Sequence, residues 1–185
     1  MSTGSPRVLV VTASRHGSTA EIGDVLARTL RECDAGRSAG LDSIAMPMEQ
    51  RPDPGPFSAV LLGSAVYAGR WLEPARQYAA DHAVALHTRP TWLFSSGPIG
   101  SPPFPPDEPH DVAPLAQAIG ARGSVVFPGR LDKERLGFGE RAMVTAMRAP
   151  LGDFRNWDAV RAWAETVAGQ VVAAVARPTV SHPPP

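Results

Sequence analysis

The stretch that decides the fold is residues 7–22, RVLVVTASRHGSTAEI. Its apolar run Val8 to Val11 contains three β-branched valines, which is typical of a strand buried on both faces of a parallel sheet. From Thr19 onward, apolar residues recur at the spacing of one helix face, and they include Ile22, Val25, Leu26 and Leu30. The residues in between therefore predict a loop that leads from a buried strand into the N-terminus of a helix.

That loop is rich in hydroxyl groups and glycine. The first N–H groups of a helix are unpaired and carry a partial positive charge, so they bind an anion without needing a lysine. Ser14, Ser18 and Thr19 add hydroxyl donors, and Gly17 allows a close approach of the backbone or a positive φ. The pattern indicates a phosphate site, with a simple capped helix after a strand as the alternative. Neither G-x-x-x-x-G-K-[ST] nor G-x-G-x-x-G is present here, so a mononucleotide is favoured over a nucleoside triphosphate or a dinucleotide.

Length and composition limit the classes of protein that fit. With 185 residues and 43% hydrophobic content, we expect a single domain over residues 1–176 and a disordered Pro-rich tail over 177–185. Eighteen basic and eighteen acidic residues cancel, which argues against a nucleic-acid partner. The lone Cys33 excludes an internal disulfide, so redox work would need a cofactor. No metal site is expected, because the histidines at 16, 82, 87, 110 and 182 have no metal-ligand spacing.

The rest of the chain alternates between strand-like and helix-like segments. Strands are predicted over 42–46, 59–64, 91–96 and 124–128, and helices over 72–82, 114–121, 133–147 and 157–176. This alternation predicts an α/β fold, a parallel sheet with helices on both faces. Ligands of such sheets bind beyond the carboxyl ends of the strands, where three loops converge. No apolar stretch is long enough to cross a bilayer and no signal peptide is apparent, so we expect a cytoplasmic protein.

The second and third loops suit a flat ligand. The second supplies Ala65, Val66, Tyr67, Ala68 and Gly69, and either Tyr67 or Trp71 could stack on a planar ring. The alternative for Trp71 is packing on the sheet at the start of the next helix. The third loop supplies small residues whose backbone N–H groups can face a ligand: Ser95, Ser96, Gly97 and Gly100. The Pro-rich segment 101–109 is either a rigid lip over the site or an exposed connection.

The segment Ser14-Arg15-His16-Gly17-Ser18-Thr19 resembles the phosphate loop of the flavodoxin superfamily, although His16 stands where a threonine is usual. The resemblance implies a three-layer sandwich with a five-stranded sheet in the order 2-1-3-4-5, and FMN as cofactor. The three loops above would then bind its phosphate and bracket its ring. It also implies that a glycine peptide of the second loop, at Gly69, can turn its carbonyl toward the flavin.

Over residues 1–176 the chain looks most like the menaquinone-dependent protoporphyrinogen oxidase family and its flavodoxin-domain relatives. The matching segments are 14–22, Tyr67-Ala68-Gly69-Arg70-Trp71, Asn156-Trp157-Asp158 and, in general character only, the arginine-bearing segment 136–148. The resemblance implies an FMN-dependent enzyme of heme biosynthesis that passes electrons from a porphyrinogen to a quinone. Trp71, Arg135 and Arg141 are candidates for contacts with the substrate or a partner. Segment 136–148 could bind a propionate-bearing tetrapyrrole, a quinone or a bilayer surface, or form plain core.

Other functions remain compatible with this sequence. One is an electron carrier that delivers electrons to a redox protein, although carrier flavodoxins are strongly acidic and this chain is neutral. Another is an NAD(P)H-dependent FMN or quinone reductase, for which no nicotinamide-binding motif is evident. A third is a relative whose flavin site has changed. The sequence indicates no oligomeric state, and it leaves peripheral contact with the inner face of a membrane open.

Overall fold

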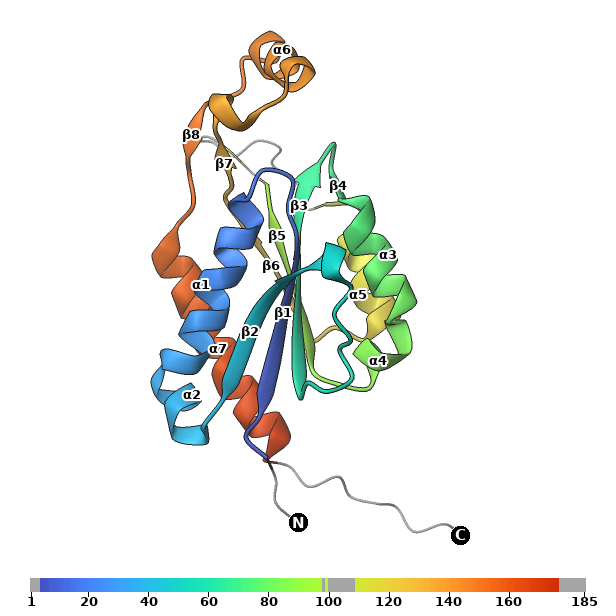
Figure 1. Ribbon diagram of the computed structural model, residues 1–185, viewed down its shortest axis with the longest axis vertical. Helices are drawn as coiled ribbons and strands as arrows, with labels where there is room; N and C mark the ends of the chain where they lie inside the picture. Colours follow the sequence, from blue (N-terminus) through green and yellow to red (C-terminus); the bar gives the residue numbers. More distant parts are fainter. Residues whose placement is uncertain (1–3, 98, 100–108, 177–185) are drawn as a thin grey trace.

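The computed structural model describes residues 4–97, 99 and 109–176. Five parallel strands form the centre of the molecule (Figure 1): β1 (Arg7–Ala13), β2 (Asp42–Pro47), β3 (Ala59–Tyr67), β5 (Thr91–Ser96) and β6 (Ser124–Phe127). They lie in the order β2-β1-β3-β5-β6, which confirms the predicted 2-1-3-4-5 arrangement. A sixth strand, β4 (Arg70–Trp71), pairs antiparallel with the end of β3 and was not predicted.

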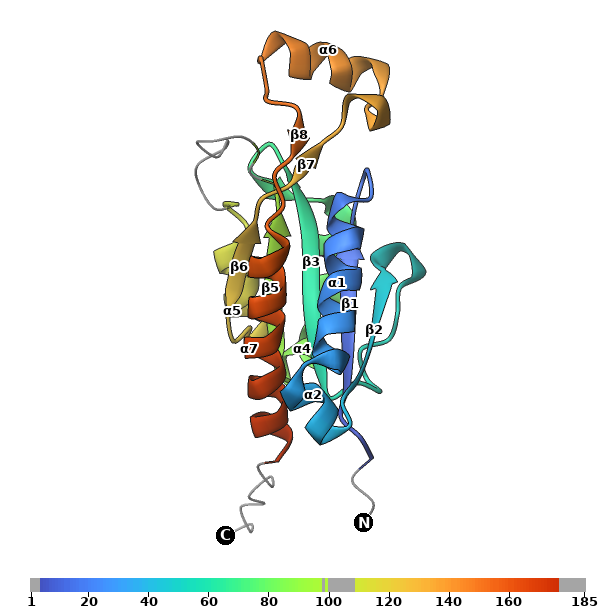
Figure 2. The same cartoon turned by 90° about the vertical axis from the view of Figure 1, so that its left-hand side faces the viewer.

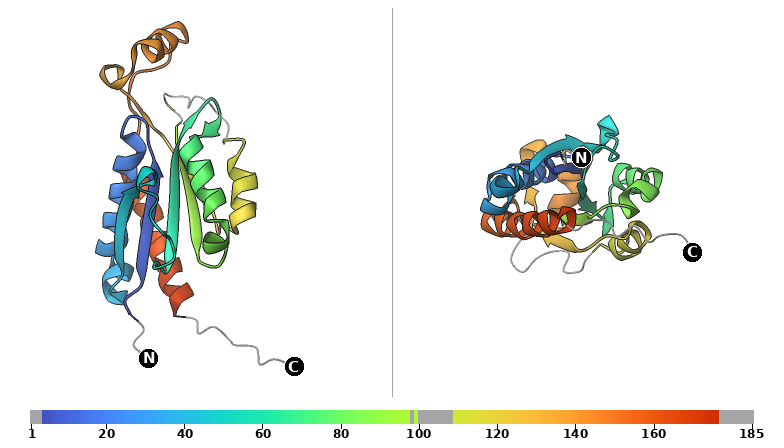
Figure 3. Two further views of the ribbon diagram at one scale, coloured as in Figure 1. Left: turned by 45° about the vertical axis from the view of Figure 1, so that its right-hand side comes forward. Right: turned by 90° about the horizontal axis from the view of Figure 1, so that it is seen from below.

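Helices cover both faces of this sheet (Figures 2 and 3). One face carries α1 (Ser18–Glu32), α2 (Asp34–Ala39) and α7 (Trp157–Val175); the other carries α3 (Glu73–Asp81), α4 (Ala83–His87) and α5 (Val112–Ile119). Strand β1 contributes side chains to the core on both faces of the sheet. Val8 and Val10 pack toward α1 and α7, while Leu9 and Val11 face the side covered by α3, α4 and α5. All four are fully buried, and each contributes about 1.5–3 kcal/mol of transfer free energy.

Several predicted boundaries are confirmed and others move. The expected strand over 42–46 is β2, and the expected last helix is α7, which begins at Trp157 because the Asn156 side chain accepts a hydrogen bond from the Ala159 N–H (3.0 Å). The helix expected over 114–121 lies two residues earlier, as α5, because Gly120 ends it in a left-handed conformation. The short elements α2 and η1 (Met48–Gln50) were missed. The predicted tail 177–185 and the segment 100–108 lie outside the described residues.

The helix expected over 133–147 is the main correction. It is broken into η2 (Lys133–Arg135) and α6 (Phe138–Ala146), since Leu136 is extended and Gly137 starts a new helix with its N–H bonded to Glu140 Oε2 (2.9 Å). Two short strands, β7 (Arg130–Leu131) and β8 (Gly152–Asp153), pair below it. We call residues 130–153 the excursion. It rises above the carboxyl edge of the sheet with α6 at its tip (Figure 1), and α6 has no buried residue.

Among the described residues, no helix is long and apolar enough to cross a membrane.

The close contact between β3 and β5 generates a stability prediction. A Cβ added at Gly63 would lie 2.0 Å from Cζ of Phe94, its neighbour across the strands, in the buried core. Gly63→Ala should lower the free energy of unfolding by at least about 1–3 kcal/mol, as overpacking does. Urea denaturation measures the change. The control is Gly169→Ala, at an exposed position of helix α7 where an added Cβ would meet no atom within 4 Å. It should stabilise by about 0.5–1 kcal/mol, and equal effects of the two changes would contradict the packing described.

Candidate functional site

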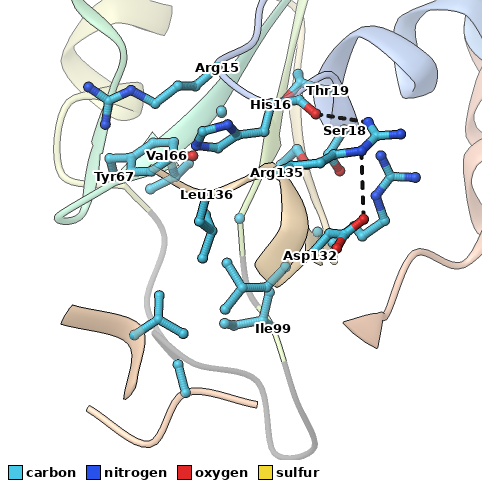
Figure 4. A pocket seen from close by; sticks show the side chains of 18 of the residues that line it. Arg15, His16, Ser18, Thr19, Val66, Tyr67, Ile99, Asp132, Arg135 and Leu136 are labelled. Atoms are coloured by element: carbon cyan, nitrogen blue, oxygen red, sulfur yellow. Dashed lines mark hydrogen bonds and ion pairs between the residues drawn. The ribbon is translucent and has the colours of Figure 1, made fainter. Parts of the chain in front are cut away.

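A pocket opens at the carboxyl edge of the sheet, beneath the excursion, and the loop Ser14–Thr19 forms one wall of it (Figure 4). We call this segment the phosphate loop. It contains the N-cap of α1, Gly17, whose φ of 85° is a left-handed conformation that glycine adopts without strain. The Gly17 carbonyl accepts the first helical hydrogen bond, from the Glu21 N–H (3.0 Å). The glycine is therefore needed for the chain to enter the helix at this angle.

Three hydroxyl groups of the phosphate loop are buried and have no hydrogen-bond partner among the described residues. They are those of Ser14, Ser18 and Thr19, and all three residues line the pocket. A buried polar group left without a partner costs about 1–3 kcal/mol, so an unpaired set of three is uncommon in a folded protein. Together with the N–H groups of the α1 N-terminus they form a set of donors that matches the oxygens of a phosphate group. The loop joins β1 to α1, as the sequence predicted, and its role in holding a phosphate stays a prediction.

The second wall is the turn between β3 and β4. Tyr67 pairs with Arg70, and the two residues between them both have positive φ, 50° at Ala68 and 72° at Gly69, as in a type I′ hairpin turn. Ala65, Val66, Tyr67 and Ala68 line the pocket as predicted. Gly69 does not line it.

The Gly69 carbonyl accepts a hydrogen bond from the His110 N–H (2.9 Å). The expected rotation of this carbonyl toward a flavin would break that bond.

Tyr67 presents the aromatic surface of this wall. The Arg15 guanidinium lies 5.2 Å from the centre of its ring, and the His16 ring lies 6.5 Å away. Burial, with a further contribution from the negative charge of Glu140, raises the pKa of Tyr67 above its usual value. The phenol therefore stays neutral at physiological pH and acts as a flat apolar surface.

Trp71 is not available for stacking, contrary to the expectation that it contacts a ligand or partner. It is 2% exposed and packs in the core between the sheet and α3. Its indole N–H donates to the Ser95 hydroxyl (2.8 Å), and its backbone N–H donates to the Asp111 carboxylate (3.1 Å). Ser95 does not line the pocket, because its side chain is buried on Trp71, and its predicted contact through a backbone N–H group stays a prediction.

The third loop meets the pocket through Ser96, Gly97 and Ile99. Ser96 and Gly97 were predicted, and Ile99 was not. Gly100, the remaining predicted residue of this loop, lies outside the described residues.

The excursion supplies a further wall, which includes residues of the segment 136–148 that was named as a possible binding segment. Arg135 lines the pocket. So do residues in and beside strand β7, which are Gly129, Arg130, Leu131 and Asp132, and the apolar residues Leu136, Met143, Val144, Met147 and Ala149. Arg141, the other arginine predicted to contact a substrate, does not line it. Its guanidinium donates to the carbonyls of Leu136 (2.9 Å) and Glu134 (3.2 Å), and so holds the turn between η2 and α6. The helical spacing of the apolar residues was the available signal for this wall.

Two acidic residues connect the excursion to the phosphate loop and to α1, the helix that follows it. Glu140 at the start of α6 accepts from Arg15 (3.1 Å) and lies 3.2 Å from His16 Nε2. The Gly137 N–H and these two side chains lower the pKa of Glu140. Glu21 of α1 accepts from Arg130 (3.0 Å) and Arg155 (2.7 Å). Burial opposes its ionisation, but the two arginines outweigh burial and lower the pKa of Glu21. Both carboxylates are ionised at neutral pH.

The described residues contain no group of three His, Cys, Asp or Glu side chains arranged to hold a metal ion.

Solved structures share this fold at low sequence identity. An archaeal flavodoxin is 12% identical, with a TM-score of 0.60, over 89% of this chain and 98% of its own. Flavodoxin 1 of Bacillus cereus is also 12% identical, with a TM-score of 0.55, over 91% of this chain and 97% of its own. The rubredoxin oxygen:oxidoreductase of Desulfovibrio gigas is 13% identical, with a TM-score of 0.61, over 92% of this chain but only 37% of its own.

No curated protein matches the sequence. A family model described as "Flavodoxin domain" matches residues 9–157, which is most of the chain. The chain therefore belongs to the flavodoxin-domain family, in which FMN is the bound cofactor.

Proposed function

We propose that the chain is an FMN-dependent oxidoreductase that resembles protoporphyrinogen oxidase and passes electrons from a reduced organic substrate to a quinone. The observation that carries the proposal is that the pocket does not end at the phosphate loop. It continues upward to Met143, Val144 and Met147 of the excursion, so the wall opposite Tyr67 is apolar. A second molecule with a largely apolar ring system would contact this wall beside a bound cofactor, and the pyrrole rings of a porphyrinogen and the ring of a quinone both belong to that chemical class.

The residues present fit FMN. Ser14, Ser18 and Thr19 offer unpaired buried hydroxyls to its phosphate, together with the N–H groups of the α1 N-terminus. The hairpin 65–68 and the pair Ser96–Gly97 would bracket its ring from two sides. When bound, FMN supplies the redox chemistry, while the protein supplies position and electrostatics. The chain's own residues then have three tasks: to orient the ring, to exclude water from it, and to hold the substrate against it.

The excursion favours an enzyme over a carrier. A carrier needs an accessible cofactor edge and a charged surface that docks on its redox partner, and this chain has a formal charge of zero. Here α6 lies above the carboxyl edge of the sheet (Figure 1), and two of its residues, Met143 and Val144, line the pocket together with its C-cap residue Met147. We place the reaction in the cytoplasm. Phe138, 92% exposed on α6, would be available for peripheral contact with a membrane that holds the quinone.

The first test concerns the phosphate loop. Gly17→Val should weaken FMN binding at least about tenfold, because a side chain is strained at a φ of 85° and would enter the space that the phosphate approaches. Quenching of flavin fluorescence during titration measures the affinity. Gly139→Ala is the control, since nothing lies within 4 Å of Gly139. If Gly17→Val bound FMN as tightly as Gly139→Ala does, the loop would not be the phosphate site.

The second test concerns the substrate. FMN-loaded protein should oxidise protoporphyrinogen with menadione as acceptor, which is followed by porphyrin fluorescence. Met147→Gln places a polar group in the apolar wall and should raise the KM for the porphyrinogen about tenfold, without changing FMN affinity. Phe138→Gln is the matched control on the same helix, because Phe138 does not line the pocket. A rate for the loaded wild-type protein no higher than autoxidation would refute the proposed substrate and favour the carrier.

A further inference from the structure

The phosphate loop directs its own cations away from its unpaired hydroxyls. The Arg15 guanidinium lies over the Tyr67 ring and bonds Glu140 (3.1 Å), and His16 Nε2 faces the same carboxylate (3.2 Å). In Figure 4, Arg15 extends toward Tyr67, on the side opposite Ser18 and Thr19. The hydroxyls and helix N–H groups supply hydrogen bonds but only partial charges, whereas a phosphate monoester carries about −1.5 to −2 at pH 7.

A cation from a distant part of the sequence lies beside the phosphate loop. Arg135, on the excursion, lines the same pocket, and its Nη1 donates to the His16 carbonyl (3.1 Å). The same nitrogen lies 3.2 Å from the point that a Cβ of Gly17 would occupy. Figure 4 shows its guanidinium beside Ser18, at the opening of the phosphate loop.

Of the three arginines near Glu21, Arg135 makes the weakest ion pair. The nearby carboxylate of Glu21 is already held by two hydrogen bonds from Arg130 (3.0 and 3.2 Å) and by Arg155 (2.7 Å), whose side chain is 3% exposed. Arg135 is 46% exposed, 3.5 Å from Glu21 and 3.6 Å from Asp132. Exposed pairs at such distances contribute about 0–1 kcal/mol, so its guanidinium can turn toward a new anion at little cost.

From this geometry we propose that Arg135 is a residue of the phosphate site, where its guanidinium neutralises the phosphate of bound FMN and makes the pocket prefer FMN over riboflavin. The inference rests on the proposed FMN site. A guanidinium offers several N–H donors in a fixed plane, which suits phosphate oxygens. It also makes the excursion part of the cofactor site, so that the phosphate is held by two segments more than a hundred residues apart.

The test compares two flavins and two variants. Arg135→Gln removes the charge but keeps an N–H donor for the His16 carbonyl. It should raise the Kd for FMN about 10- to 100-fold, the loss expected for a charged hydrogen bond, and leave the Kd for riboflavin unchanged. Lys133→Ala is the matched control. It removes the same charge from the same exposed turn, at a residue that does not line the pocket, and should change neither Kd.

The remaining outcomes separate this inference from the proposed function. If Arg135→Gln weakened both flavins equally, its role would be structural and the inference would be wrong. If Lys133→Ala weakened FMN as much as Arg135→Gln does, the effect would be one of net charge, which also overturns it. If the wild-type protein preferred FMN to riboflavin and Arg135→Gln kept that preference, the proposed role of Arg135 would be wrong, while the FMN site would stand. Wild-type protein that binds neither flavin would refute both the inference and the FMN site.

Discussion

The rest of the structure depends on the junction between β1 and α1, where three buried hydroxyls of the phosphate loop have no hydrogen-bond partner within the described part of the chain. Strand β1 lies between β2 and β3 and is covered by helices on both faces, so its carboxyl end is fixed in position. Gly17 then turns the chain into α1 with the helix N-terminus facing the pocket. The stability lost by leaving these donors unpaired is recovered when a ligand supplies acceptors. Folding therefore builds a site whose chemistry is already that of an anion receptor.

The excursion is tied to this junction by ion pairs and hydrogen bonds that are partly buried or exposed. No residue of α6 is buried, and the helix meets the phosphate loop through Glu140, which pairs with Arg15 and His16. Such pairs contribute about 0–1 kcal/mol each, so the excursion opens more easily than the sheet unfolds. A weakly held cover would suit the function proposed above, in which the pocket admits a bulky substrate and then excludes water. The same contacts connect the apolar wall of the excursion with the phosphate loop.

The sequence predicts those features that depend on local pattern. The strands, the phosphate loop and the helix that follows it were predicted because apolar spacing and the Gly17 turn are properties of neighbouring residues. Trp71 was misplaced because its partners, Ser95 and Asp111, lie 24 and 40 residues further along the chain. Of the two candidate arginines, only Arg135 lines the pocket. The helical spacing of the apolar residues predicts one continuous helix here, but the helix is interrupted at Leu136 and Gly137. The short strands β4, β7 and β8 carry no periodic signal at all.

The most direct measurement is a crystal structure of the full chain with FMN bound. The account predicts phosphate oxygens within hydrogen-bond distance of the Ser14, Ser18 and Thr19 hydroxyls, with the ring between Tyr67 and the Ser96–Gly97 segment. A phosphate bound elsewhere, or the three hydroxyls still without partners in the complex, would contradict it.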